Sequence, residues 1–334
     1  MTDYLQNVAD IEAVIGKTPP AINLKVINHL DASALQWLGL AQLAFASFCR
    51  DNTPRITLGG GDAGFASGTR QTLTLPLACL DEPALAVAGA SVGSLFLVPG
   101  LCETLRINGT VEALSDKHVS ISVAECYLHC GKALIRSAFW EGVPVEDTDR
   151  DITERVEQSR FMALATVNSA DEADLSPKGD PARQLTGLVD GQLVFADRPG
   201  NKRVDSFRNI VSQPRVAGAL LIPGSNHVAT FTGRAALTTR QQQRERLAVD
   251  GRTPKLAIEV EDLSLESGTS AALERARLWQ SAPVPPDIEP GKVFAAHIRA
   301  NKKRSIGARV AAAAVSVPGL MQRGLDKDYE DNLY

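Results

Sequence analysis

Three features are scarce in this sequence, and each scarcity narrows the class of protein. The chain has five cysteines in 334 residues, an odd number without zinc-site spacing, so neither a disulfide framework nor a structural metal is expected. No apolar run is long enough to span a bilayer, and residues 1–4 (MTDY) do not begin a signal peptide. The net charge of −4 argues against general binding to nucleic acid or anionic lipid. We therefore expect a reduced, soluble, cytoplasmic protein.

An internal repeat divides the chain. The segment 95–100 (LFLVPG) recurs as 219–224 (ALLIPG), and the same offset of 124 residues carries Gly109 onto Gly233. Further on, ALIRSAFW at 133–140 resembles ALERARLW at 272–279 at an offset of 139, so the second copy is longer, and we place the extra residues at Gln241–Arg246. The length suits two domains, each able to bury its own core. The sequence thus predicts two tandem copies of one domain.

Both copies have the pattern of β-strands more than of helices. Apolar and polar residues alternate at 119–123 and at 256–260, as in half-buried strands, and short apolar runs at 161–167, 193–196 and 217–222 predict further strands. Helices are expected at 33–48 and 202–211, where apolar residues fall three and four apart. We place a first domain at 1–145, a second at 146–282, and a linker and tail at 283–334, for which the first copy has no counterpart.

The loop 197–203 (DRPGNKR) carries the clearest chemical pattern. It follows an expected strand and leads into an expected helix, and Pro199-Gly200 lets its backbone turn close to a ligand. Asn201 can cap the helix, and Arg198, Lys202 and Arg203 add cations to the helix N-terminus. Such an arrangement suits a phosphate group. A solvated basic turn is the competing interpretation, and the pattern by itself leaves both open.

A second cluster, 174–180 (DLSPKGD), places a cation and a carboxylate on a tight turn. By itself it indicates an ordinary β-turn. Together, SPKGD at 176–180, DRPGNKR at 197–203 and PG at 223–224 closely resemble the probable FMN-dependent proteins of the pyridoxamine 5′-phosphate oxidase superfamily. The first half resembles the later part of the same pattern, with PG at 99–100, ETLRING at 103–109 and HCGKA at 129–133. The resemblance spans roughly 24–140 and 156–279.

This resemblance implies a fold and a site. The fold is mainly β with flanking helices: two tandem six-stranded split β-barrels paired as an intramolecular pseudo-dimer, with FMN bound in a cleft between them. A further homodimer is left open. The family's phosphate-binding cations map onto Lys202 and Arg203, with Lys178 as a neighbour. The implied cofactor-binding residues are Arg106, Lys132, Ser176, Lys178, Asp197, Arg198, Asn201, Lys202, Arg203 and Ser206, and the catalytic candidates are His129 and Arg136.

Each copy departs from the family pattern in a different place. In the first copy, GGGD at 59–62 replaces the Ser-Pro-basic-Gly-Asp turn, and 77–89 contains no cation. In the second, GTSA at 268–271 stands where the first has HCGK. One cleft can therefore combine the intact parts of both copies, and we expect one functional site in each chain.

Some residues admit two interpretations. His129 can handle a proton, because unperturbed imidazole titrates near neutral pH, or it can be a half-buried histidine bonded to a carbonyl. Cys130 can be a reactive thiol beside Lys132 and Arg136, or a small buried side chain. In the tail, the basic run at 302–304 and the acidic stretch at 326–331 are expected to form a solvated arm.

The leading functional hypothesis is an FMN-dependent oxidoreductase acting on a small molecule of unknown identity. The alternative is a protein that binds flavin or haem without turnover, with His129 as an iron ligand. A scaffold in which neither cleft works, and a deazaflavin in place of FMN, also remain open.

Overall fold

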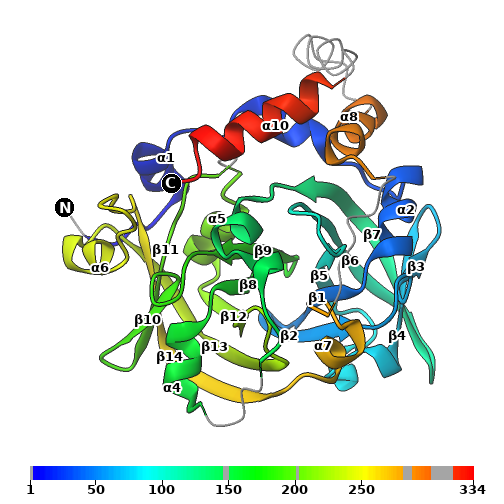
Figure 1. The fold of residues 1–334 in the computed structure, drawn as a ribbon, viewed down its shortest axis with the longest axis horizontal. Helices are drawn as coiled ribbons and strands as arrows, with labels where there is room; N and C mark the ends of the chain where they lie inside the picture. Colours follow the sequence, from blue (N-terminus) through cyan, green and yellow to red (C-terminus); the bar gives the residue numbers. More distant parts are fainter. Residues whose placement is uncertain (1–2, 146–149, 201–202, 281–287, 302–318) are drawn as a thin grey trace.

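The computed structural model describes residues 3–145, 150–200, 203–280, 288–301 and 319–334. Its first sheet contains seven antiparallel strands in the order β2-β1-β5-β6-β7-β4-β3. They are β1 (Leu43–Arg50), β2 (Thr53–Gly60), β3 (Ser67–Gly68), β4 (Thr72–Pro76), β5 (Ser91–Leu97), β6 (Thr104–Leu114) and β7 (His118–His129). Figure 1 shows this sheet on the right.

The second sheet repeats the first, strand for strand, in the order β9-β8-β12-β13-β14-β11-β10. Its strands are β8 (Phe161–Val167), β9 (Ala173–Gly179), β10 (Thr186–Val189), β11 (Gln192–Ala196), β12 (Arg215–Leu221), β13 (His227–Thr238) and β14 (Ala257–Thr269). The identical order confirms the tandem duplication predicted from the sequence. Each sheet has seven strands rather than the six that the resemblance implied, because a short edge strand, β3 or β10, is added.

Short helices flank the sheets. In the first half they are α1 (Val8–Ile15), η1 (Pro20–Lys25), α2 (Ala32–Leu40), η2 (Leu77–Cys79), η3 (Pro83–Leu85), α3 (Lys132–Arg136) and η4 (Phe139–Glu141). In the second half and tail they are α4 (Ile152–Gln158), α5 (Asp205–Ser212), α6 (Gln241–Arg246), α7 (Ala271–Ala276), α8 (Pro290–Ala300) and α10 (Leu320–Asp331). Helix α6 lies between β13 and β14, at the residues where the repeat offset placed the extra length of the second copy.

Two helix predictions need correction. The expected helix at 33–48 ends at Leu40, and the chain then enters β1, which is buried at all positions except Arg50. A strand buried on both faces has no polar alternation, so its apolar residues imitate helical spacing. The expected helix at 202–211 begins only at Asp205. Its N-cap is Val204, whose φ of 53° is left-handed, so the expectation that Asn201 caps this helix is wrong. Asn201 and Lys202 lie outside the described residues.

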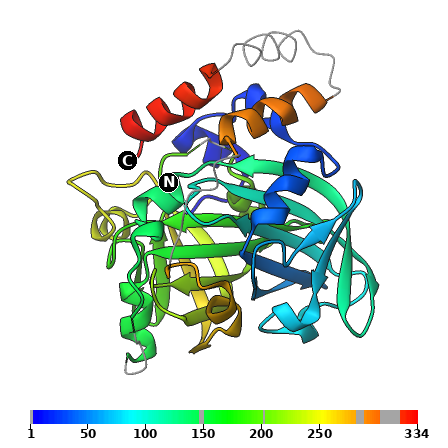
Figure 2. The same ribbon diagram turned by 45° about the vertical axis from the view of Figure 1, so that its right-hand side comes forward.

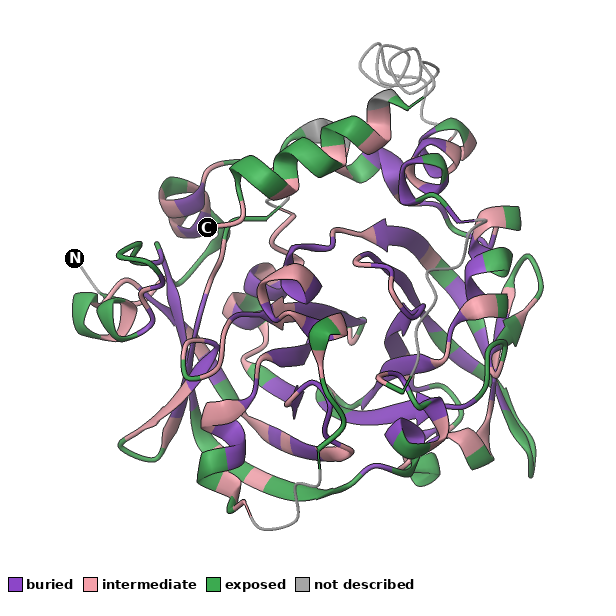
Figure 3. Ribbon diagram, in the orientation of Figure 1, coloured by how far each residue is buried: buried purple, intermediate pink, exposed green. Residues whose placement is uncertain are grey.

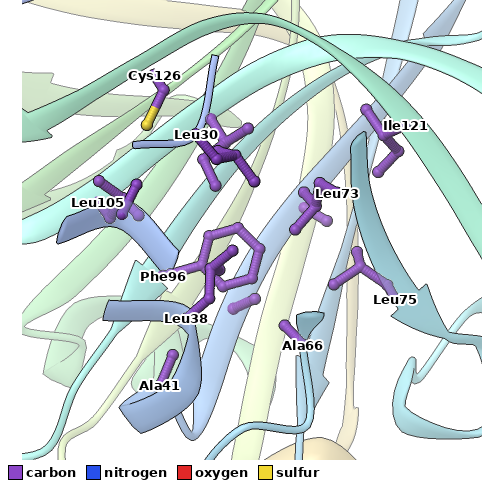
Figure 4. Packing of buried hydrophobic residues seen from close by; sticks show 14 of the residues in the cluster. Leu30, Leu38, Ala41, Ala66, Leu73, Leu75, Phe96, Leu105, Ile121 and Cys126 are labelled. Atoms are coloured by element: carbon purple, nitrogen blue, oxygen red, sulfur yellow. The ribbon is translucent and has the colours of Figure 1, made fainter. Parts of the chain in front are cut away.

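The three largest hydrophobic clusters of the described residues hold the two barrels and their contact together. One fills the first barrel, where Phe96, Leu73, Leu105 and Leu38 belong to one packed cluster (Figure 4). A second fills the other barrel and includes Ile11 of α1, so the start of the chain packs on the second copy. The third lies between the copies and unites residues of both. Burial of apolar surface between the two sheets makes them an intramolecular pseudo-dimer.

Aromatic rings mark the centre of this shared core. The ring centroids of Phe45 and Phe161 are 5.4 Å apart, and those of Phe139 and Phe161 are 5.1 Å apart. Phe45 and Phe139 belong to the first half and Phe161 to the second. Figure 3 shows the strands where the two sheets meet as mostly buried.

In each copy a helix packs against the residue that ends a strand of the other copy: α3 against Gly179 at the end of β9, and α7 against Gly60 at the end of β2. In Gly179 an added Cβ would lie 1.9 Å from the carbonyl oxygen of Ala133 in α3, and in Gly60 it would lie 2.2 Å from that of Ala272 in α7. Only glycine permits these approaches. The two contacts are related by the pseudo-two-fold relationship of the copies, and both set the walls of the clefts between them.

The tail packs against both copies rather than extending into solvent. Helix α8 packs beside β7 and buries His297, and α10 lies across the molecule on the side of α1 and α8 (Figures 1 and 2). The expectation of a solvated arm is therefore wrong for the acidic stretch, which lies in α10; the basic run at 302–304 lies outside the described residues. No described helix is long and apolar enough to cross a membrane.

Candidate functional site

A cavity of about 410 Å³ lies between the two copies. The end of β7 and helix α3 supply its wall from the first half. The end of β9, the loop after β11 and the first turn of α5 supply its wall from the second. The volume is in the range of pockets that hold small molecules and cofactors.

The lining is strongly cationic. Eight lysine and arginine side chains and only three carboxylates line the cavity, although the chain as a whole carries a net charge of −4. The cations are Arg106, Lys132, Arg136, Lys178, Arg198, Arg203, Arg252 and Lys255, and the carboxylates are Asp180, Asp197 and Asp205. Positive charge concentrated in a cavity attracts and holds an anionic ligand.

Arg106 joins the two halves at the floor of the cavity. Its Nη1 lies 2.6 Å from Oδ1 of Asp174 and 2.5 Å from the hydroxyl of Tyr127, and its Nη2 donates to Oγ of Ser176 at 2.9 Å. The side chain is 1% exposed. Its Nε is buried without a hydrogen-bond partner among the described residues.

Two lining lysines, Lys255 and Lys178, have no ion pair or hydrogen bond among the described residues; Lys255 is exposed, whereas Lys178 is the more enclosed. Its Nζ lies 4.8 Å from the ring centroid of Phe207, and among the described residues it has neither an ion pair within 4.0 Å nor a hydrogen bond. Burial lowers its pKa, an effect that the negative charge of Asp197 opposes. Buried charges are normally paired, so an unpaired ammonium in a cavity is typical of an anion site.

Asp197 titrates within the physiological range. Burial raises its pKa to about 6, although Lys178, Arg136 and Arg198 lower it. A carboxylate repels a phosphate group, so we interpret Asp197 as a residue whose negative charge favours the protonated form of Lys178 rather than one that touches the anion. Perturbed carboxyl groups in clefts are also typical of functional sites.

Arg198 and Arg136 line the cavity, but most of their hydrogen-bond donors bind acceptors of the protein itself. Arg198 donates to Oδ2 of Asp180 at 2.7 Å and to the carbonyl of Leu247 at 2.6 Å. Arg136 donates from Nε to the carbonyl of Gly179 at 2.9 Å and from Nη1 to that of Pro199 at 3.2 Å. Both arginines therefore hold the walls of the cavity in place.

Two further cations are paired at the edge of the site. Arg203 forms an ion pair with Asp205, and its guanidinium lies 4.3 Å from the ring centroid of Tyr127. Lys132 is buried and lies 2.8 Å from Oδ2 of Asp328 in the tail. Ser206 lies in the first turn of α5 and lines the cavity.

His129 lies at the end of β7 in cationic surroundings. Burial lowers its pKa well below the ordinary value, and the charges of Arg106 and Lys25 lower it further. The imidazole is therefore neutral at neutral pH, and the premise that it titrates there does not hold. It can still donate or accept a hydrogen bond. Cys130 next to it is a free, half-buried thiol that lines the cavity.

The structure brings the described candidate residues to one place. All ten line the cavity: Arg106, His129, Lys132, Arg136, Ser176, Lys178, Asp197, Arg198, Arg203 and Ser206. Asn201 and Lys202 lie outside the described residues. Sequence reasoning missed Arg252, Lys255 and Tyr334. The first two follow α6 in the segment that only the second copy has, and that extra length was the available signal.

The pseudo-equivalent cleft is built from the opposite parts. It is lined by 61–65, Cys79, Arg275 and Arg277. Arg275 donates to the carbonyl of Gly60 at 3.0 Å, as Arg136 does to that of Gly179 at 2.9 Å. Arg277 forms an ion pair with Asp62 at 2.6 Å. Gly59 stands where the other copy has Lys178, so this cleft lacks the unpaired lysine.

Two antiparallel sheets of one strand order, paired around a shared core, define a duplicated split β-barrel protein. Residues 148–280 match the family model of pyridoxamine 5′-phosphate oxidase. The second copy is therefore similar to this family, and the first copy repeats its strand order.

Solved structures of similar fold are distant in sequence. HupZ of Group A Streptococcus is 15% identical, with 36% of this chain and 94% of that chain covered and a TM-score of 0.30. General Stress Protein 26 of Bacillus anthracis is also 15% identical, with coverages of 35% and 95% and a TM-score of 0.27. An F420 reductase is 15% identical, with coverages of 36% and 98% and a TM-score of 0.26. A search of curated proteins found no match.

Proposed function

We propose that the cavity binds FMN and that the protein is an FMN-dependent oxidoreductase acting on a small molecule. The observation that carries the proposal is the excess of cations in a cavity to which both copies contribute, with Lys178 unpaired inside it. The match of the second copy to the pyridoxamine 5′-phosphate oxidase family supports a flavin as the ligand.

The residues present fit such a cofactor. The ammonium of Lys178 and the amides at the start of α5 can receive a phosphate group, and the loop at Pro199-Gly200 lies beside them. When bound, a flavin supplies the redox chemistry, and the protein supplies binding and orientation.

The side chains of the first half would then face the ring. Neutral His129 offers a hydrogen bond rather than a positive charge, and Arg136 fixes the loop after β11 through the carbonyl of Pro199. Enclosure between the two copies keeps water from the reacting atoms, which strengthens each polar contact there. The substrate would enter between these walls.

The absorbance spectrum of the purified protein tests the cofactor class. Flavin bands support the proposal, a haem Soret band supports a haem protein with His129 as a possible ligand, and a colourless protein that FMN cannot reconstitute contradicts both. A flavin that is bound but never reduced by any tested donor would support a binding protein without turnover.

Substitution of the unpaired cation tests the geometry. In Lys178→Met we expect FMN to bind at least about tenfold more weakly, because a charge-assisted hydrogen bond is lost, whereas riboflavin should change little. Lys292→Met, which removes an exposed lysine of α8, is the control. Equal losses for FMN and riboflavin would show that Lys178 does not contact phosphate.

A further inference from the structure

The end of the tail reaches the cavity from outside. Tyr334 lines it, with its ring centroid 5.9 Å from the guanidinium carbon of Arg136 and 5.8 Å from that of Arg198. Its carbonyl oxygen accepts from Nη1 of Arg252 at 2.8 Å, and the carbonyl of Leu333 accepts from Nη1 of Arg136 at 2.9 Å. This segment therefore contacts both copies at the mouth of the site.

The last turns of α10 anchor the segment on the first copy. Oδ2 of Asp328 lies 2.8 Å from Nζ of Lys132. The hydroxyl of Tyr329 donates to Oε1 of Glu103 at 2.8 Å and accepts from the amide of Gly131 at 3.0 Å. Glu103 and Lys132 are both buried. Because a buried charge without its partner is costly, these contacts favour the docked position of the tail.

The cavity keeps its volume of about 410 Å³ with Tyr334 in place. The tail is thus a wall of the site and not an occupant of it. We infer that residues 328–334 form part of the ligand-binding site: Tyr334 closes its outer side, and the anchored turn of α10 must detach before a large ligand can leave. The inference rests on the proposed function only in naming FMN as that ligand.

Two readouts separate the tail from the cofactor assignment. The first needs no flavin. It is the ratio of two rates of alkylation by iodoacetamide, that of Cys130 divided by that of Cys79. Cys130 lines the cavity, and Cys79 lines the pseudo-equivalent cleft. In the double variant Asp328→Asn/Tyr329→Phe the ratio should rise about tenfold, because local detachment exposes only one cleft. Glu330→Gln, an exposed carboxylate on the same helix, is the matched control and should not change it.

The second readout is the rate of FMN release. It should increase about tenfold in the double variant, with Glu330→Gln unchanged. Tyr334→Ala, which leaves Lys132 paired with Asp328, should also release FMN faster. Because this variant keeps the buried ion pair, it distinguishes loss of the wall from a folding defect of the double variant. An unchanged alkylation ratio, or unchanged FMN release despite a raised ratio, overturns the inference. If FMN binds to no variant, a raised ratio still supports the wall and the cofactor proposal alone fails.

Discussion

Nη1 of Arg106 lies 2.6 Å from Oδ1 of Asp174, and the two residues belong to different copies of the repeat. Both are buried, so the pair is a buried polar link between the two copies. An exposed pair of the same length, Arg277 with Asp62, stands at the pseudo-equivalent cleft. The molecule therefore contains its own comparison between a buried and an exposed ion pair.

We expect Arg106→Ala to lower the free energy of unfolding by about 3 kcal/mol or more, because it leaves the carboxylate of Asp174 buried and unpaired. Arg277→Ala should cost less than about 1 kcal/mol, since its pair is exposed to solvent. Urea denaturation of the protein without added ligand measures both. Similar losses in the two variants would show that Asp174 finds another partner.

The carboxyl of Asp197 should make stability depend on pH. Its pKa is raised to about 6 in the folded protein, so the folded state binds the proton more tightly than the unfolded chain does. The stability it contributes is therefore present at low pH and is lost as the pH rises through 6. In Asp197→Asn this loss should disappear, so the variant gains on the natural protein as the pH rises from about 4, where an unfolded aspartate ionises, to about 6, and the difference stays constant at higher pH.

Denaturation midpoints across that range provide the measurement. Asp116→Asn, on the exposed hairpin between β6 and β7, is the control and should follow the natural protein at each pH. A parallel profile for Asp197→Asn and the natural protein would mean that the carboxyl does not titrate near neutrality.

Gly179→Ala and Gly60→Ala form a second internal comparison. Each new methyl would collide with a helix carbonyl, at 1.9 Å from Ala133 and 2.2 Å from Ala272, so each should cost about 1–3 kcal/mol or more of stability. Only Gly179→Ala moves the helix that carries Lys132 and Arg136. Isothermal titration should therefore show weaker FMN binding in Gly179→Ala and unchanged binding in Gly60→Ala. Equal effects on binding would contradict a single functional cleft.

One chain should bind one FMN. The cavity at Lys178 has eight cations, whereas the other cleft has two arginines, one held by Asp62 and one by backbone carbonyls. Titration of FMN against a known protein concentration measures the ratio. Two equivalents for each chain, or a second copy that binds FMN as tightly when expressed alone, would refute the assignment.

Much of the fold followed from local pattern. The runs at 161–167 and 217–222 are strands β8 and β12, and the repeat predicted two equal sheets. The prediction of helix for residues 41–48 was wrong because both faces of β1 are covered, one by the barrel core and one by the other copy. That second covering is a long-range contact, and no local periodicity reports it.

The site was predictable where chemistry is concentrated in short motifs. Lys178 and Arg203 stand in such motifs and reach the cavity as expected. Other contacts of the site join residues that are remote in sequence. Asp174 forms an ion pair with Arg106 of the other copy, and Tyr334 of the tail lines the cavity. Motif spacing says nothing about these contacts, because the fold alone brings them together.

Fusion of the two copies also changes how the molecule can vary. In a symmetric dimer of identical subunits every substitution appears in both clefts, so one cleft cannot be altered without the other. Here Lys178 and Gly59 occupy equivalent places and are encoded separately. A change beside Arg275 leaves the cationic cavity untouched, which makes the second cleft a region where new surface chemistry can be introduced without loss of the first.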